Sequence, residues 1–415
     1  MIDKLNNEAE SDWKSFVAML FFVVPFFRPT IINDWAAVSA LKSIFAIWLL
    51  VACAVSVARF IARNGRIGLF LLGLTSMLLV MYISTFAHGG SNYDAMINTA
   101  MILSSALLVT TLERREVRPF LLALTVLLLV LVASELVLRF AFPQGIYRMD
   151  GSARWILENG SLQSRWCFVL VFAAGALDYM RKGRYSLFFF FCAAISLLLV
   201  FQLASATSTV ALVAEVVIFI FSGNKRFQRA LTCRRVNLVF IVLVITIVFL
   251  RIADYLPYDS IASFLGKDLR YMSGATFTGR TYIWDSVISS IAQSPVFGYG
   301  YQQYVATDIY QFYSQTNYGS AHDLWLQIAF QGGFVGLFCF FLAYFSLCHK
   351  ADAVDLGRAR TLFIGLLIAF LITSIFENTL NSTLILALAI PTSGVMLETL
   401  EGRGVPMGGG ADVKV

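Results

Sequence analysis

Long apolar runs alternate with short polar segments along almost the whole chain. A helix rises about 1.5 Å per residue, so an apolar run of about 20 residues crosses a hydrocarbon core of roughly 30 Å. Helices are expected because they satisfy their backbone hydrogen bonds internally in lipid. We therefore predict an all-α, polytopic membrane helix bundle of about twelve spans, near residues 15–27, 35–58, 67–86, 93–112, 119–142, 164–180, 185–203, 208–222, 236–252, 323–348, 360–376 and 380–398.

Basic residues gather in every second loop between these runs. Lys and Arg beside a span resist translocation, so loops rich in them stay in the cytoplasm. The alternation predicts that these loops and both termini are cytoplasmic and that the other connections face outward. The basic loops carry Arg59, Arg63 and Arg66; Arg114, Arg115 and Arg118; Arg181, Lys182 and Arg184; Lys225, Arg226, Arg229, Arg234 and Arg235; and Lys350, Arg358 and Arg360.

Two of the outward connections are long, over about 143–163 and 253–322. Most connections in compact domains have only a few residues, so the second is more than a linker. We predict a membrane bundle of about nine spans over 1–252 and an extracytoplasmic loop with an interfacial helix over 253–322. Further spans follow over 323–400, and the glycine-rich segment 401–415 is expected to be a disordered cytoplasmic tail.

The composition agrees with a membrane protein, because 59% of the 415 residues are hydrophobic and only 13% are charged. The basic cytoplasmic loops explain the net charge of +6, so no nucleic acid is expected as a partner. The six cysteines show no metal-ligand spacing. We expect the lipid bilayer as a partner and neither a metal nor another cofactor.

The stretch TGRTYIW, residues 278–284, opens the predicted interfacial helix, and Thr278 can cap it. Arg280 lies four residues before Trp284 and shares its face, so the guanidinium points inward and requires an anion. Two interpretations remain open, an ion pair within the protein or membrane and a grip on a ligand phosphate. The candidate ion-pair partners are Asp268, Asp285 and a lipid headgroup. The apolar residues that repeat at helical spacing are Trp284, Val287, Ile288 and Ile291.

Three further arginines, Arg148, Arg154 and Arg165, lie in or beside the other long outward connection. Outward arginines run against the cytoplasmic bias of the remaining basic residues, so they need a separate reason. An anionic ligand on the outer side would supply one.

His322 stands where the long outer loop meets the next predicted span. Imidazole titrates near neutral pH, so His322 is a candidate general base, although an interfacial histidine can also serve only as a hydrogen-bonding residue. Asp323 follows it and could orient the ring. Adjacent helical residues point about 100° apart, which argues against direct pairing.

Aromatic and intramembrane polar residues complete the candidates. Tyr299 belongs to a tyrosine cluster that could stack on sugar rings or anchor the loop at the interface, and Trp284 is a further glycan-contacting candidate. Glu135 can pair with the arginine four residues after it. Lys42 and Glu215 fall within predicted spans and have no assigned role.

Three segments together resemble the signature of the O-antigen ligase and polysaccharide polymerase superfamily. TGRTYIW is similar to its G-R-x-x-x-W helix, SPVFGYG to its P-x-x-G-x-G turn, and AHDLWLQIAFQGGFVG to its H-x-x-x-L segment followed by glycines. Their order, their spacing and the large outer loop match over about residues 200–345. Each segment alone is weak, whereas the combination is specific.

The resemblance implies a metal-independent glycosyltransferase of the GT-C type whose donor is an undecaprenyl-diphosphate-linked glycan. It implies that Arg280 binds the diphosphate and that His322 assists the acceptor hydroxyl. Many ligases of the superfamily carry a Ser-Arg pair where this chain has Ser208-Thr209. A second diphosphate-binding arginine must then come from elsewhere, and Arg165 and Arg148 are the candidates.

We expect a polymerase of lipid-linked oligosaccharide repeats in the bacterial cytoplasmic membrane, with its active site outside and a flippase and a chain-length regulator as further partners. The polymerase leads because its donor and acceptor are the same lipid class. A ligase that transfers the glycan to lipid A core or another envelope acceptor would use the same site. A non-enzymatic lipid-linked oligosaccharide transporter would place its essential charges along a central cavity, whereas the candidate residues here lie on one outer face.

Overall fold

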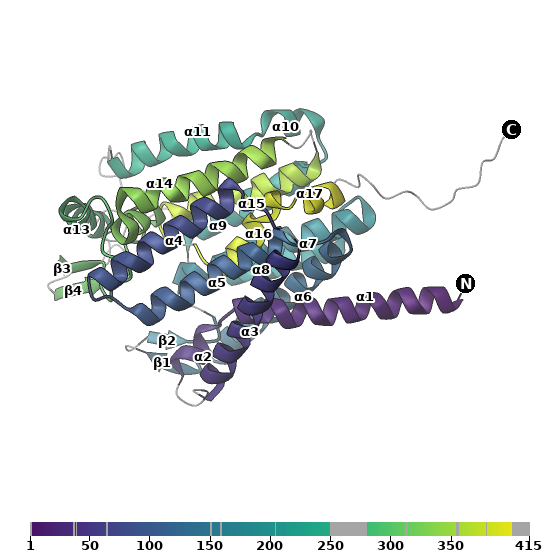
Figure 1. Ribbon diagram of the computed structural model, residues 1–415, viewed down its shortest axis with the longest axis horizontal. Helices are drawn as coiled ribbons and strands as arrows, with labels where there is room; N and C mark the ends of the chain where they lie inside the picture. The colour runs from purple at the N-terminus through teal and green to yellow at the C-terminus, as the bar shows by residue number, and fades with distance from the viewer. Residues whose placement is uncertain are drawn as a thin grey trace.

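The computed structural model describes residues 2–35, 38, 40–63, 65–149, 152–157, 160–203, 205–249, 280–311, 314–353, 357–378 and 380–400. Helices dominate it (Figure 1). The first part contains α1 (Ile2–Val23), η1 (Val24–Phe26), α2 (Thr30–Asp34), α3 (Ala40–Ala62), α4 (Leu69–Ala87), α5 (Asn92–Thr110), α6 (Arg114–Ala141), η3 (Gly160–Gln163), α7 (Ser164–Lys182), α8 (Leu187–Gln202) and α9 (Ala206–Phe221). The second contains α10 (Lys225–Ala230), α11 (Cys233–Val244), η4 (Ile245–Phe249), α13 (Arg280–Gln293), α14 (Leu324–Ala353), α15 (Arg358–Ser374), α16 (Ser382–Leu388), η8 (Ile390–Thr392) and α17 (Gly394–Leu400). Two antiparallel hairpins pair β1 (Tyr147–Met149) with β2 (Ser152–Arg154) and β3 (Ala306–Gln311) with β4 (Ser314–Tyr318).

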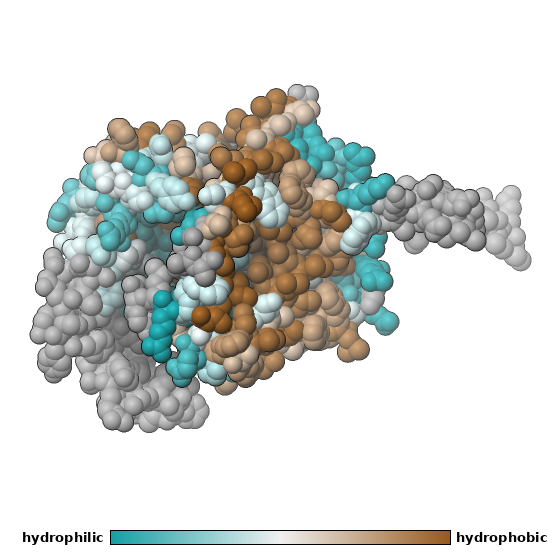
Figure 2. All heavy atoms as spheres, turned by 90° about the horizontal axis from the view of Figure 1, so that it is seen from below, coloured by the Kyte–Doolittle hydropathy of each residue, from teal (hydrophilic) through white to brown (hydrophobic). Residues whose placement is uncertain are grey.

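Five of the described helices, α3, α4, α5, α6 and α14, are long and apolar enough to cross a membrane. Shorter apolar helices cover Trp13–Phe26, α8 and α9. Figure 2 shows a hydrophobic belt around the middle of the visible face, with hydrophilic residues on both sides of it. The fold is therefore that of an all-α membrane protein. Described helices overlap each predicted run, while the number of twelve crossings and the GT-C fold remain predictions.

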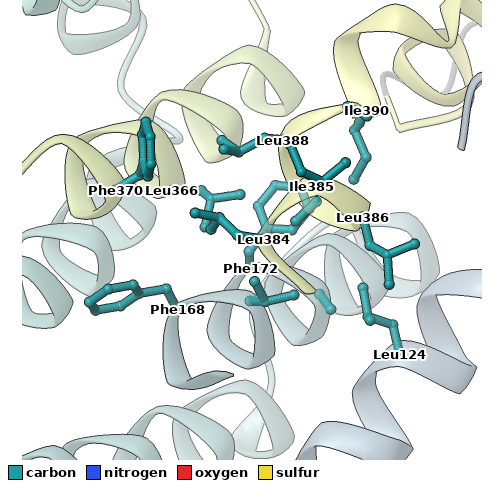
Figure 3. Packing of buried hydrophobic residues seen from close by; sticks show 14 of the residues in the cluster. Leu124, Phe168, Phe172, Leu366, Phe370, Leu384, Ile385, Leu386, Leu388 and Ile390 are labelled. Atoms are coloured by element: carbon teal, nitrogen blue, oxygen red, sulfur yellow. The ribbon is translucent and has the colours of Figure 1, made fainter. Parts of the chain in front are cut away.

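The helix α16 lies in the core of the bundle. All of its residues are buried, and Figure 3 shows its leucines packed among side chains of α6, α7 and α15, including Phe172 and Leu366. The prediction of one continuous span over 380–398 is wrong, because α16 ends at Leu388 and two short helices, η8 and α17, follow it. Pro391 has no backbone N–H to continue the helix, which explains the interruption. The predicted tail 401–415 lies outside the described residues.

Alternate loops gather at two opposite ends of the bundle. At one end Arg59 donates to the Glu116 carboxylate at 2.7 Å, and Arg360 donates to the Gln228 carbonyl at 2.7 Å. These contacts join four of the predicted basic loops in pairs. The other end carries α13 and both hairpins (Figure 1). This grouping agrees with the predicted alternation, whereas the side of the membrane that each end faces stays a prediction.

The helix α14 is broken at Gly333, which has φ 60° and ψ −164°. The turn formed by residues 295–300 fills the break with backbone hydrogen bonds. Phe334 donates to the Pro295 carbonyl at 2.8 Å, and Gly300 donates to the Gln331 carbonyl at 2.9 Å. Two further bonds, from Tyr299 to Phe330 and from Val335 to Val296, complete the set at 2.8 and 3.1 Å. The turn therefore replaces the helical hydrogen bonds that α14 loses at this point.

The turn 295–300 also packs on α4, and this contact predicts different effects on stability for alanine at two glycines of similar backbone conformation. Gly300 (φ 72°) and Gly89 (φ 65°) both lie in the left-handed region, so alanine costs roughly 1 kcal/mol at either position. A Cβ on Gly300 would stand 2.1 Å from the backbone nitrogen of Thr85, whereas a Cβ on Gly89 meets nothing within 4 Å. We expect Gly300→Ala to lower the thermal unfolding midpoint in detergent much more than Gly89→Ala. Equal shifts would contradict the close docking of this turn on α4.

Candidate functional site

The helix α13 brings Arg280 to the site. Trp284, Val287 and Ile291 are buried as predicted from their spacing, while Ile288 is 41% exposed. Arg280 is the first residue of this helix, and its side chain points inward to an anion, as the sequence required. The predicted cap Thr278 and the predicted partner Asp268 lie outside the described residues.

The anion is the carboxylate of Glu377, in the turn after α15. Its Oε1 accepts a hydrogen bond from Nη2 of Arg280 at 2.7 Å, and its Oε2 lies 3.2 Å from Nδ1 of His322. The Glu377 side chain is only 7% exposed. One buried carboxylate thus connects two residues that the sequence analysis proposed independently. The predicted alternative Asp285 does not form the ion pair with Arg280.

The backbone of His322 is held in an uncommon conformation, with φ at 49°. A left-handed non-glycine residue costs about 1–2 kcal/mol and persists only where the surroundings impose it. Here the His322 N–H donates to Oγ of Ser320 at 3.2 Å, and the Ala321 N–H donates to the Gln327 side chain at 2.8 Å. These bonds fix the residue between the outer loop and α14, so the ring meets Glu377.

Asp323 has a structural role that corrects the idea that it orients His322. Its carboxylate caps α14 by accepting the Leu326 N–H at 2.7 Å, and its own carbonyl accepts from the Gln327 N–H. The side chain is buried, and this burial raises the pKa of Asp323 to about 7 against the opposing effect of the backbone hydrogen bonds. The orienting carboxylate of His322 is Glu377.

Glu377 was not predicted from the sequence, where it stands in the stretch SIFENTLNS between the last two predicted spans. One signal could have indicated it, because it is an acidic residue in a short connection predicted to lie on the same side as arginines that require an anion. The predicted protein partners of Arg280 were only residues near it in the sequence.

A cavity of about 410 Å³ lies beside this cluster, between α4, α5, α7 and α14. Ser320, two residues before His322, and Asn378, one residue after Glu377, both line it. Arg165 also lines it and is 6% exposed. Arg148 lies on β1, is exposed and does not line this cavity. Of the two arginines proposed for the second diphosphate contact, the structure places Arg165 beside the cluster.

One comparison with known proteins finds a match to a family model. Residues 190–341 match the family model described as O-antigen ligase. Over this segment the chain is similar to the O-antigen ligase family. No curated protein matches this chain. No solved structure matches it either.

The part matched to the O-antigen ligase family includes Arg280, His322 and both sides of the junction at Gly333. Glu377 and Arg165 lie outside it. The family match thus covers the base candidate and the arginine, whereas the carboxylate that joins them comes from a helix pair beyond the matched segment.

The two aromatic candidates contribute packing at this site. Trp284 is buried in the main hydrophobic core. The ring of Tyr299 stacks on Phe330 with centroids 5.1 Å apart and contacts His88 at 5.2 Å. Neither Trp284 nor Tyr299 lines the cavity, so their assignment as glycan contacts stays a prediction.

The intramembrane charges have separate environments. Glu135 pairs with Arg139 at 2.9 Å, as predicted, and also accepts from the backbone N–H groups of Ile156 and Leu157. Glu135 therefore anchors the loop between α6 and α7. Lys42 is exposed in the first turn of α3. Glu215 on α9 is fully buried, and neither of its carboxylate oxygens has a hydrogen-bond partner among the described residues.

The assignment of Asp323 as a helix cap can be tested by stability. Asn also caps helices, so Asp323→Asn should change the free energy of unfolding by a few tenths of a kcal/mol, whereas Asp323→Ala should lower it by about 1 kcal/mol. Thermal unfolding midpoints in one detergent give the comparison. Equal losses in both variants would show that the charge of Asp323, and not its hydrogen bond to Leu326, is what matters.

Proposed function

We propose that this protein is a glycosyltransferase that polymerises undecaprenyl-diphosphate-linked oligosaccharide repeats on the extracytoplasmic side of the bacterial cytoplasmic membrane. The observation that carries the proposal is the Glu377 carboxylate, which holds an imidazole and a guanidinium beside a cavity lined by Arg165. Glycan transfer needs a base for the acceptor hydroxyl and cations for the leaving diphosphate. Both kinds of group lie at one end of this bundle.

His322 is the proposed general base. When Nδ1–H donates to Glu377, Nε2 keeps a lone pair for the acceptor hydroxyl. As the hydroxyl oxygen attacks the anomeric carbon, its proton passes to Nε2, and the Glu377 carboxylate stabilises the resulting imidazolium. The His322 side chain is 34% exposed, which leaves it accessible to an acceptor.

The arginines act on the leaving group in this mechanism. The bond between the anomeric carbon and the diphosphate oxygen breaks, and its electron pair leaves with undecaprenyl diphosphate. Arg165, on the cavity wall, stabilises this negative charge. Arg280 gives one N–H to Glu377, and because a guanidinium has five, the others remain for the diphosphate. Fixed cations in a partly buried site stabilise developing charge without reorganisation.

A ligase would use the same residues with a different acceptor, so only the acceptor separates it from a polymerase. One observation favours the transporter instead. Glu215 is a buried carboxylate without a hydrogen-bond partner in the described part of the bundle. Intramembrane ionisable residues often mark transport pathways.

A transfer assay tests the proposal directly. Purified protein in detergent receives a synthetic undecaprenyl-diphosphate oligosaccharide repeat together with a metal chelator. We expect a ladder of longer glycans from the wild type, with rates lower by on the order of 100-fold or more in His322→Ala and Glu377→Gln, because a general base contributes about 10²–10⁴-fold.

Asp323→Asn is the matched control, since it neutralises the carboxylate next to His322 and leaves the Glu377 contact intact. It should retain the rate. Product that appears only after a lipid A core acceptor is added would make the protein a ligase. Absence of product with every acceptor, combined with loss of cellular function in Glu215→Gln, would favour the transporter.

A further inference from the structure

A second arginine lines the cavity that Arg165 lines, and the sequence analysis did not consider it. Arg28 lies between η1 and α2, is partly buried, and forms no hydrogen bond or ion pair with another described residue. Two other arginines at this end have carboxylate partners, Arg139 with Glu135 and Arg280 with Glu377. An unpaired guanidinium that lines a cavity is suited to an anionic ligand.

Hydrogen bonds and ring packing hold the backbone on both sides of Arg28 in place. The Phe26 carbonyl accepts from Oγ of Ser382 at 2.6 Å, and Oγ1 of Thr30 donates to the Leu157 carbonyl at 2.8 Å. The Phe27 ring packs on Trp166 with centroids 5.4 Å apart. Arg28 is thus presented to the cavity by a short segment that is tied to α16 and to the other outer loop.

Two buried donors without partners face the same cavity. Nε1 of Trp166 and Oγ1 of Thr383 have no hydrogen-bond partner among the described residues, and these side chains are 2% and 1% exposed. Buried polar groups in folded proteins are almost always hydrogen-bonded, so unpaired ones around a cavity point to a ligand that supplies the acceptors. Both residues line the cavity.

The charges that line the cavity favour an anionic ligand. Its lining includes two guanidiniums, Arg28 and Arg165, and the carboxylate of Asp94. Asp94 accepts from Oγ of Ser91 at 2.6 Å, and Ser91 caps α5 by accepting the Asp94 N–H. A volume of about 410 Å³ is within the range of small-molecule sites.

We propose that Arg28 and Arg165 together bind the diphosphate of the lipid-linked substrate, with Trp166 and Thr383 donating to its oxygens. This inference rests on the proposed function and adds to it a residue from the N-terminal part of the chain, far in sequence from the segment matched to the O-antigen ligase family. Arg28 holds one phosphate and Arg165 the other, so the cavity distinguishes a diphosphate from a monophosphate.

The test measures binding of radiolabelled undecaprenyl diphosphate and undecaprenyl phosphate to the full-length protein in nanodiscs, with and without competing inorganic pyrophosphate. The wild type should bind the diphosphate more tightly than the monophosphate. Arg28→Gln should weaken diphosphate binding by roughly tenfold or more and monophosphate binding much less, because it removes charge-assisted hydrogen bonds. Arg28→Lys should restore part of the loss.

Arg154→Gln is the matched control. Arg154 lies on β2 at the same end, its side chain also has no described partner, and it does not line the cavity, so Arg154→Gln should leave binding unchanged. Thr383→Val provides a second measurement that does not depend on a charge. It removes an unpaired buried hydroxyl, so the thermal midpoint should stay or rise while diphosphate affinity falls severalfold.

Wild-type diphosphate affinity in Arg28→Gln, or equal losses in Arg28→Gln and Arg154→Gln, would overturn the inference. So would an equal effect of anionic phospholipid and undecaprenyl diphosphate as competitors, because the cavity would then bind any lipid phosphate. Failure of the wild type to transfer glycan, with diphosphate binding that depends on Arg28, would count against the proposed function and leave the binding site standing.

Discussion

The break in α14 at Gly333 is the constraint on which the rest of the bundle end that carries α13 depends. A broken helix within a membrane protein leaves backbone N–H and C=O groups that lipid cannot satisfy, at a cost of several kcal/mol each. The turn 295–300 supplies two acceptors and two donors in the right positions. A side chain at Gly333 would place its Cβ 2.2 Å from the Val296 carbonyl oxygen. No other residue type therefore fits at this contact.

This junction positions the candidate chemistry. The turn begins two residues after α13 ends at Gln293, so docking it on α14 also fixes α13 and carries Arg280 to Glu377. The same α14 begins at the cap formed by Asp323, directly after His322. His322 and Arg280 therefore reach the same carboxylate from the ends of two helices, α14 and α13, that are joined by the docked turn. The left-handed backbone at His322 is tolerated because these contacts determine it.

Sequence reasoning succeeded where the signal was local. Apolar runs located the helices, basic loops predicted which connections lie together, and the spacing of Trp284 and Val287 predicted the inward face of α13. It failed where the outcome depends on packing between distant segments. Glu377 is 97 residues from Arg280 and 55 from His322, and no pattern near either residue indicates it. Hydropathy also continues through Gly333, so the break within the predicted span 323–348 was invisible.

Arginines at the two ends of the bundle differ in their partners. At the end with the basic loops, Arg59 and Arg360 are bound to a carboxylate and a carbonyl through their terminal nitrogens, although the buried Nε of each has no described partner. At the opposite end, the cavity keeps the Arg28 guanidinium, the Trp166 indole N–H and the Thr383 hydroxyl without described partners. Burying donors in this way lowers stability unless a ligand completes their hydrogen bonds. A fold that satisfies the backbone at Gly333 so fully, yet leaves three donors open on one cavity, is organised to bind an acceptor-rich anion there.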